Sequence, residues 1–332
     1  MKFRTEIDVH IANFPITHRQ KLVMLGSCFA ENIGERLVNC KFDIDLNPFG
    51  ITYNPLSAAK AISLLLDEYS FSRSDVLARN GLYFSLMHHG DFSSPDLDQF
   101  LQQLNLRREK GSQNLRKADW LILTFGTSYV YETIENRQIV NNCHKLPASY
   151  FHRRRLSVAE IVDVWSEIII KVQLVNPGIR FLFTVSPVRH LKDGAHENQL
   201  SKSILLLAID ELRDKFPEEI DYFPSYELIL DDLRDYRFYA TDMIHPGIQA
   251  VEYCLGKFAD AYFSEETQLI NRKWTEISKA LQHRPLKGDT PEYRLFLEKT
   301  QIKLKNFQDR YSYILCQREI DELESRISLL GD

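Results

Sequence analysis

Residues 22–37, LVMLGSCFAENIGERL, join an apolar run to an amphipathic one through Gly26, Ser27 and Cys28. The apolar run is typical of a buried strand, and apolar side chains return at helical spacing over residues 29–37. A serine at this junction lies at or just before a helix N-terminus, where free backbone N–H groups and the helix dipole favour negative charge. That position suits a nucleophile, but serine is also a preferred helix N-cap. This stretch alone leaves both interpretations open.

Further apolar and amphipathic segments alternate along the chain. Strands are expected at 21–25, 120–125 and 180–185, with a fourth around 221–228, and helices at 57–69, 96–109, 157–175 and 197–216. This alternation predicts an α/β fold with a mostly parallel, doubly wound sheet. Ligands of such sheets bind beyond the carboxyl ends of the strands. We therefore expect the polar residues that follow the first three strands to converge on one site.

Composition limits the class of protein and its partners. The chain has 332 residues, of which 44% are hydrophobic and 26% charged, and a formal net charge of −5. These values are typical of a soluble globular protein and predict no nucleic-acid partner and no membrane partner. The N-terminus lacks the apolar core of a signal peptide, and no run approaches the roughly 20 apolar residues of a membrane span. We expect a cytoplasmic protein.

The cysteine pattern and the lack of nucleotide motifs predict neither a metal nor a cofactor. The five cysteines are widely spaced without a Cys-x-x-Cys pair, which favours reduced thiols over disulfides or a structural zinc site. No glycine-rich dinucleotide fingerprint or phosphate loop occurs. A metal site is the rival chemistry, but its potential ligands come from separate loops. These ligands are Cys143, His144, His190, Asp242 and His245.

The last part of the chain differs in character. We expect an α/β domain over residues 1–264 and a helical extension over 265–332, with a linker at 283–294. Apolar residues of the extension fall into two phases, Leu304, Phe307, Tyr311 and Ile314, then Ile320, Leu323, Ile327 and Leu330. The shift argues against one uninterrupted coiled coil. Packing against the α/β domain is the first expectation, and a homodimer through these helices is the alternative.

A second stretch, YATDMIHPG at 239–247, supplies what a serine nucleophile needs. Asp242 and His245 are three positions apart, so in a turn the carboxylate can orient the imidazole. His245 would then act as general base and acid toward Ser27. Cys28 competes as the nucleophile, but beside the apolar Phe29 it equally suits a small packing residue.

The string Gly26-Ser27-Cys28-Phe29-Ala30 and several later blocks resemble the GSCFA domain family. The blocks are NPFGITYNP (47–55), FGTSYVY (125–131), NNCHKLP (141–147), FTVSPVRH (183–190), YFPSYEL (222–228) and RFYATDMIHP (237–246). That family is grouped with the SGNH or GDSL-like hydrolases. The resemblance, which covers roughly residues 20–262, implies a three-layer α/β/α, flavodoxin-like fold. It also implies hydrolysis or transfer of an acyl ester, often an acetyl group on carbohydrate.

Carried over to this sequence, the resemblance implies a catalytic set of Ser27, Asp242 and His245. The backbone N–H groups of Ser27 and Gly50 would form the oxyanion hole, with the side-chain amides of Asn47 and Asn54 as alternatives. Related hydrolases place an asparagine two residues after a glycine in the third block, whereas this chain has Gly126-Thr127-Ser128. Thr127, Ser128 or Asn142 would replace that donor.

Four polar residues complete the predicted site as substrate-binding groups: Asn54, His144, Arg189 and His190. They suit an anionic or polyhydroxyl substrate. The expected function is hydrolysis of an O-acyl ester, such as O-acetyl, on a small-molecule or saccharide substrate. The alternatives are an O-acyltransferase on the same fold and a carbohydrate-binding or scaffold protein with a degenerate site.

Overall fold

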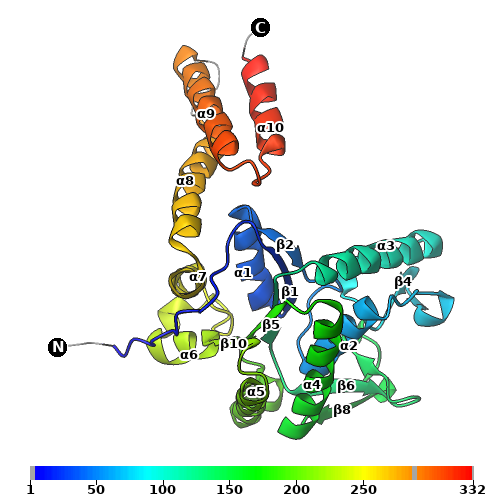
Figure 1. Ribbon diagram of the computed structural model, residues 1–332. Coiled ribbons are helices and arrows are strands. Elements are labelled where there is room, and N and C mark those ends of the chain that lie inside the picture. Colours follow the sequence, from blue (N-terminus) through cyan, green and yellow to red (C-terminus); the bar gives the residue numbers. More distant parts are fainter. Residues whose placement is uncertain (1–3, 286–289, 331–332) are drawn as a thin grey trace.

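The computed structural model describes residues 4–285 and 290–330 and has a five-stranded parallel sheet at its centre (Figure 1). The strands are β1 (Lys21–Gly26), β2 (Asp43–Leu46), β5 (Trp120–Phe125), β9 (Arg180–Val185) and β10 (Ile220–Phe223), in the order β10-β9-β5-β1-β2. In chain order this is the 2-1-3-4-5 arrangement of flavodoxin-like sheets. The order reverses between β1 and β5, so the ligand crevice of such a fold lies at the carboxyl ends of these two strands.

Helices cover both faces of this sheet. Helices α1 (Cys28–Asn39) and α7 (Ile248–Tyr262) lie on one face, and α2 (Pro55–Leu66), α3 (Leu97–Arg116), α4 (Val158–Val175) and α5 (Ala195–Lys215) on the other. Successive strand side chains point to opposite faces. Leu22 and Met24 therefore pack with the first group of helices, and Val23 and Leu25 with the second. This confirms the predicted three-layer α/β/α sandwich.

Several elements differ from the sequence prediction. Strand β2 was not predicted because its four residues, DIDL, alternate acidic and apolar side chains at the sheet edge. Helix α3 continues past the predicted end at residue 109 to Arg116, through a polar segment without an apolar stripe. The predicted strand at 221–228 ends at Phe223. Pro224 follows it, and the short helix α6 (Ser225–Glu227) continues into a π-helical turn at Leu228–Asp232.

Two small antiparallel sheets were also missed. Strands β6 (Tyr129–Thr133), β7 (Ile139–Val140) and β8 (Phe151–Arg155) form one in the order β7-β6-β8, and β3 (Leu77–Arg79) with β4 (Leu82–Phe84) forms a hairpin. Strand β6 begins four residues after the end of β5, so the chain returns beside the carboxyl end of the central sheet. Tyr129, Tyr131 and Arg153 of the three-stranded sheet consequently line the same cavity as Ser27.

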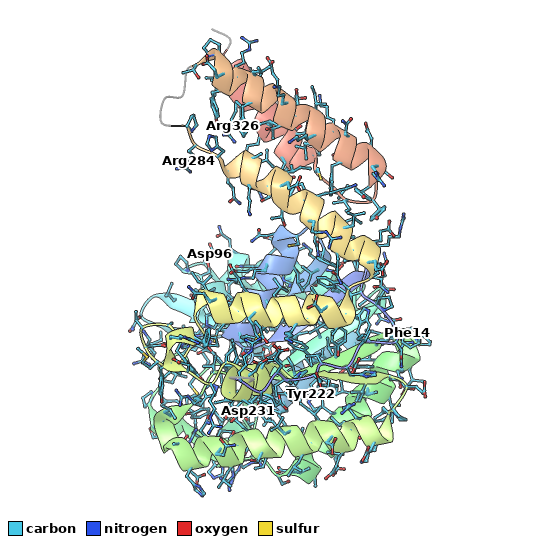
Figure 2. All side chains as sticks on the ribbon, turned by 90° about the vertical axis from the view of Figure 1, so that its left-hand side faces the viewer. Phe14, Asp96, Tyr222, Asp231, Arg284 and Arg326 are labelled. Carbon is cyan, nitrogen blue, oxygen red and sulfur yellow. The ribbon has the colours of Figure 1, made fainter. Side chains whose placement is uncertain are left out.

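The C-terminal helices form an arm with its own apolar core (Figure 1). They are α8 (Glu265–Gln282), α9 (Pro291–Arg310) and α10 (Gln317–Ser328). The two groups of apolar residues that differ in phase in the sequence are separated by the point where the chain reverses direction between α9 and α10. Figure 2 shows Arg326 at the end of the arm that is remote from the sheet, where its Nη1 donates to the Leu281 carbonyl at 2.7 Å. This contact joins α10 to α8.

The arm also touches the α/β domain at its base. Trp274 Nε1 donates to the carbonyl of Asn39 at 2.6 Å, and Lys41 pairs with Glu319 at 2.5 Å. Of the expected linker at 283–294, residues 286–289 lie outside the described part, and the prediction is wrong from Pro291 onward. Helix α9 starts there because the hydroxyl of the N-cap Thr290 accepts the N–H of Tyr293. Association of two chains through the arm stays a prediction.

All five cysteines are free thiols. Within residues 4–285 and 290–330, no helix combines the length and the apolar character that crossing a bilayer would require.

Candidate active site

A cavity of about 750 Å³ lies at the carboxyl ends of β1, β5 and β9. The topology of the sheet predicts a ligand crevice at this edge. The cavity brings together these residues of the predicted site: Ser27, Asn54, Thr127, Asn142, Arg189, His190 and His245. Asp242 does not itself line the cavity but bonds to His245, which does. Gly50 and His144 do not line the cavity.

Ser27 occupies the N-cap position of α1, but its side chain does not cap the helix. The residue is 1% exposed, and its Oγ has no hydrogen-bond partner among the described residues. Buried hydroxyls are nearly always hydrogen-bonded, so an unpartnered one needs an explanation. The first N–H groups of a helix also have no intrahelical acceptor. Ser27 therefore combines an unpartnered hydroxyl with nearby backbone donors of the kind that stabilise an anion.

The pair Asp242 and His245 forms within one tight loop, as its spacing predicted. His245 Nδ1 lies 2.5 Å from Asp242 Oδ2, while Asp242 Oδ1 accepts the backbone N–H groups of Ile244 at 2.9 Å and His245 at 3.0 Å. The backbone N–H groups of His245 and Ile244, followed by the imidazole, lower the pKa of Asp242 to about 2. The ionised carboxylate favours a proton on Nδ1, which leaves Nε2 as a proton acceptor.

The loop that carries this pair is held by backbone contacts and by Arg189. The N–H of Ala240 donates to the His245 carbonyl at 2.8 Å, and Arg189 Nη2 donates to the Met243 carbonyl at 2.7 Å. Met243 has a φ of 58°, which fits a tight turn. Arg189 lies near the rings of Tyr236 and Tyr239, and it forms no ion pair with a carboxylate among the described residues. Arg189 therefore lines the cavity and also positions the histidine loop.

His190, predicted to bind substrate, lies beside the serine. A Cβ on Gly126 would lie 3.4 Å from His190 Nε2 and 3.6 Å from Ser27 Cβ, so both side chains flank this glycine. The same Cβ would lie 3.0 Å from the Tyr53 carbonyl oxygen, a tight contact that a larger residue could make only if the backbone moved slightly. Burial, followed by the charge of Lys202, lowers the pKa of His190 to about 4. Its Nε2 is buried without a partner and belongs to a neutral ring at pH 7.

Gly50 does not provide the oxyanion donor that the resemblance implied. Its N–H already donates to the Asn47 carbonyl at 2.8 Å, within the turn that NPFG forms. The side chain of Asn47 accepts the N–H of Gly26 at 3.0 Å and so holds this turn against the end of β1. Asn54 does line the cavity, but its Oδ1 caps α2 by accepting the N–H of Ser57 at 2.8 Å. These residues mainly support the backbone around the site.

His144 has a structural environment rather than the predicted contact with the cavity. Its Nε2 lies 2.9 Å from the carbonyl oxygen of Ser85 and 3.1 Å from that of His88, and its ring packs against Phe84. Burial lowers the pKa of His144. Its neighbour Asn142 does line the cavity, and Asn142 Oδ1 accepts the N–H of His144 at 2.8 Å. The amide nitrogen of Asn142 then remains as a donor.

The neighbours of Thr127 determine where its hydroxyl can donate a hydrogen bond. Ser201 Oγ accepts both the N–H of Ser128 at 2.8 Å and the Ser128 hydroxyl at 3.0 Å, which fills its two acceptor positions. The Ser201 proton must therefore go to Thr127 Oγ1, 3.1 Å away. Thr127 Oγ1 also accepts the N–H of Tyr129 at 3.1 Å. With both acceptor positions filled, the Thr127 hydroxyl can only donate, and Thr127 lines the cavity.

The N-terminal part of α5 supports the site with a buried polar face that sequence reasoning missed. Asn198, Ser201 and Lys202 share this face, since they are spaced three and four positions apart. Asn198 Oδ1 accepts the N–H of His190 at 2.9 Å. Lys202 Nζ donates to the carbonyls of Gly126 and Ser186, both at 2.6 Å, and so joins the ends of β5 and β9. The sequence signal that could have revealed these residues is the polar face in the first turns of an amphipathic helix.

Cys28, the rival nucleophile, also lines the cavity. It is half-buried, and burial raises the pKa of its thiol. A raised pKa keeps the thiol protonated at neutral pH and lowers its nucleophilicity. Among the described residues no group of three or more His, Cys, Asp or Glu side chains is arranged to hold a metal ion.

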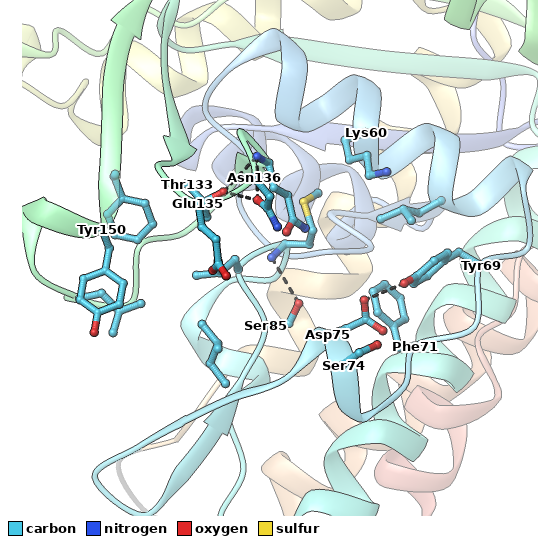
Figure 3. A pocket seen from close by; sticks show the side chains of 17 residues that line it. Lys60, Tyr69, Phe71, Ser74, Asp75, Ser85, Thr133, Glu135, Asn136 and Tyr150 are labelled. Atoms are coloured by element: carbon cyan, nitrogen blue, oxygen red, sulfur yellow. Dashed lines mark hydrogen bonds between the residues drawn. The ribbon is translucent and has the colours of Figure 1, made fainter.

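A second cavity, of about 340 Å³, is drawn in Figure 3. It adjoins the first, because Leu146 and Phe151 line both cavities. Two pairs of its polar side chains bond to each other. The hydroxyl of Tyr69 donates to Asp75 at 2.7 Å, and that of Thr133 to Asn136 at 2.5 Å. The first cavity instead contains the unpartnered Ser27 Oγ and is therefore the candidate active site.

Comparisons with known proteins identify the family. A search of the curated proteins found no match. An acetyl xylan esterase (Est2A) from the rumen bacterium Butyrivibrio proteoclasticus is 12% identical, with 75% of this chain and 64% of that chain covered and a TM-score of 0.38. A carbohydrate esterase family 3 structure from Talaromyces cellulolyticus is 9% identical, with 76% and 99% covered and a TM-score of 0.33. Residues 274–328 match the family described as "GSCFA domain protein, C-terminal domain". Because the GSCFA family matches residues 21–258, more than half of the chain, this protein belongs to the GSCFA family.

Proposed function

We propose that this protein is a serine ester hydrolase of the SGNH type, which cleaves an O-acyl ester through an acyl-Ser27 intermediate. One observation carries the proposal. The unpartnered, buried Ser27 Oγ and the imidazole of His245 line the same cavity, and Asp242 holds the Nδ1 side of that imidazole. A nucleophile, a base and a group that orients the base are the parts of a serine hydrolase site.

In the first half of the reaction, Ser27 Oγ attacks the ester carbonyl carbon while His245 Nε2 takes the hydroxyl proton. The carbonyl oxygen becomes an oxyanion in the tetrahedral intermediate. The backbone N–H of Ser27 and the hydroxyl of Thr127 donate to it, with the amide of Asn142 as a further candidate. Collapse of the intermediate breaks the bond to the alcohol oxygen, which leaves with the proton from His245.

In the second half, His245 Nε2 takes a proton from water, and the resulting hydroxide attacks the acyl-Ser27 carbonyl carbon. Collapse releases the carboxylic acid and returns the proton to Ser27 Oγ. Asp242 stays ionised through both halves at neutral pH, because its pKa is about 2. Its negative charge stabilises the imidazolium that forms twice in each cycle.

The proposed substrate is an ester, such as an O-acetyl ester, of a small molecule or a carbohydrate. The cavity wall contains the aromatic side chains of Tyr53, Tyr131 and Phe151 beside the amide side chains of Asn141 and Asn142. Aromatic rings offer flat apolar surfaces, and amides offer both donors and acceptors. This mixture suits an alcohol with several hydroxyl groups.

Acyl transfer to a hydroxyl acceptor is a second candidate. Ser27 is 1% exposed, and this shielding from bulk water would limit hydrolysis of an acyl intermediate. Adding glycerol or methanol during turnover distinguishes the two reactions. A transferase forms the new ester at the expense of free acid, whereas a hydrolase releases mainly acid.

The test of the proposed function is hydrolysis of p-nitrophenyl acetate by wild type, Ser27→Ala and Cys28→Ser. We expect Ser27→Ala to lower kcat by about a thousandfold or more. Cys28→Ser keeps a packing side chain of similar size and should retain most of the activity. A fluorophosphonate probe should label Ser27 in wild type and in Cys28→Ser. Equal rates for wild type and Ser27→Ala would contradict the proposal, and labelling at Cys28 alone would assign the nucleophile to the thiol.

A further inference from the structure

The cavity around Ser27 is lined by cationic side chains and, among the described residues, by no carboxylates. Arg153, Arg189 and Lys192 belong to its wall, whereas none of the described lining residues is Asp or Glu. The chain as a whole has a formal net charge of −5. The charge of the cavity is thus opposite in sign to that of the protein.

The carboxylates that lie closest to these cations along the chain and the strands already have partners. Both oxygens of Asp193 accept from Arg153 at 2.6 Å, which neutralises that guanidinium. Glu197 accepts from the hydroxyl of Tyr129 at 2.7 Å and pairs with Arg155. Asp242 is bound to His245. Glu197 and Asp242 are therefore engaged by other groups. The hydrogen bonds from Arg153, followed by the charges of Arg153 and Lys192, lower the pKa of Asp193, so Asp193 offsets part of the charge of Lys192.

Neither Arg189 nor Lys192 forms an ion pair within the described part of the chain, although Asp231 and Asp235 share the wall of a neighbouring cavity with Arg189. Arg189 donates to the carbonyl of Met243, which leaves most of its N–H donors without a protein acceptor. Lys192 Nζ donates to the hydroxyl of Tyr131 at 3.0 Å, a neutral acceptor. The two residues flank His190 on the segment that follows β9. A cleft with low-dielectric walls and charges of one sign attracts ligands of the opposite sign.

We propose that the substrate of this site is an anionic ester, whose acidic group binds between Lys192 and Arg189 while the ester carbonyl lies at Ser27. This inference rests on the proposed function and narrows its substrate class. Carboxylate, phosphate and sulfate groups share the required chemistry, because each accepts charge-assisted hydrogen bonds from ammonium and guanidinium groups. A neutral acetylated sugar would leave both cations without an ion-pair partner.

Two matched pairs of esters test this and separate the two halves of the ester. For an anion on the alcohol half, 4-acetoxybenzoate is compared with the neutral 4-acetoxybenzamide. For an anion on the acyl half, mono-4-nitrophenyl adipate is compared with its neutral methyl ester. We expect kcat/KM to be about tenfold higher for the anionic member of one pair, with the difference mainly in KM. The preference should weaken as salt is added, since salt screens exposed charges.

Charge reversal shows whether Lys192 is responsible. Lys192→Glu should invert the preference, so that the neutral ester of the pair becomes the better substrate. Lys110→Glu makes the same charge change on the exposed side of α3, away from the cavity, and should retain the wild-type preference. Wild-type selectivity that survives Lys192→Glu would overturn the inference. So would equal kcat/KM values for both members of both pairs.

A binding measurement separates failure of this inference from failure of the proposed function. Calorimetric titration of Ser27→Ala with 4-acetoxybenzoate and with 4-acetoxybenzamide requires no turnover, and repeating it with the adipate pair covers the acyl half. We expect the anionic member of the preferred pair to bind about tenfold more tightly, and this difference to be lost in Ser27→Ala/Lys192→Glu. Binding without turnover in wild type would contradict the proposed hydrolase but support the anion site. Ser27-dependent turnover without any anion preference would support the proposed hydrolase and contradict the anion site.

Discussion

Ser201 Oγ determines the direction of the Thr127 hydroxyl, although the two residues come from different elements. The contact spans 3.1 Å, and every acceptor position of both oxygens is filled by a donor from Ser128, Tyr129 or Ser201 itself. The Thr127 proton therefore has no acceptor left within this cluster. It is available to a group in the cavity, and it needs no reorientation when a negative charge develops there. Preorganised donors of this kind stabilise transition states most effectively.

Thr127→Val should reduce catalysis more than stability. The substitution keeps the shape of the side chain and removes one donor, so we expect kcat/KM for p-nitrophenyl acetate to fall by about ten- to a hundredfold. The loss should be in kcat, because an oxyanion exists only along the reaction path. Thr127→Ser retains the hydroxyl and is the matched control. A Thr127→Val enzyme with wild-type kcat would exclude the hydroxyl as an oxyanion donor.

We expect Ser201→Ala to lower activity through its effect on the Thr127 hydroxyl. Without Ser201, the Thr127 proton is no longer forced toward the cavity, and we expect a smaller loss of kcat than in Thr127→Val. The double variant should be no slower than Thr127→Val alone, because the positioning residue then has nothing to position. Steady-state kinetics of the four proteins in this cycle measure the coupling. Fully additive losses would show that Ser201 acts on the site by another route.

Asp242→Asn should lower kcat by about three to four orders of magnitude and leave the fold intact. An amide at this position can turn its NH₂ toward the imidazole, which would favour the wrong tautomer of His245. Because the pKa of Asp242 is about 2, its protonation does not account for activity changes above about pH 4. Rate measurements between pH 5 and 9, with circular dichroism as a check of folding, test this. A variant that retains a tenth of the wild-type kcat would show that catalysis does not need the Asp242 carboxylate to orient His245.

Lys202 should make stability depend on pH in a defined direction. Burial lowers its pKa from 10.5 to about 7, although its two carbonyl acceptors favour the charged form. Between about pH 7 and pH 10.5, the side chain of Lys202 is protonated in the unfolded chain and neutral in the folded protein. The free energy of unfolding therefore rises with pH from about 7 toward about 10, by roughly 2–4 kcal/mol from this group.

Lys202→Met removes that titration while keeping a long side chain. Urea unfolding of both proteins at several pH values gives the difference between their free energies of unfolding. The contributions of other titrating groups are the same in both proteins and cancel in this difference. We expect wild type to gain stability relative to Lys202→Met as pH rises from 7 to 10. Parallel curves would mean that Lys202 keeps its ordinary pKa when buried. Because the side chain also joins the ends of β5 and β9, we expect lower activity in the variant.

Patterns within short segments predicted the scaffold and part of the site. The apolar runs at 21–25, 120–125 and 180–185 correspond to β1, β5 and β9, and their alternation with helices predicted the parallel sheet. The pairing of Asp242 with His245 was predictable for the same reason, because three positions in one turn determine it. The apolar runs could not reveal β2, whose side chains alternate in polarity at an edge.

The sequence by itself determined where strands β1, β5 and β9 run and that Ser27 lies between a buried strand and a helix. Only the tertiary structure decided what that serine contacts. It showed that Ser27 does not cap α1, that the N–H of Gly50 is used within its own turn, and that Ser201 and Lys202 support the cavity from α5. The physical reason is the range of the interactions. Helix and strand patterns reflect residues a few positions apart, whereas hydrogen-bond partners and the charge of a cavity depend on segments that only folding brings together.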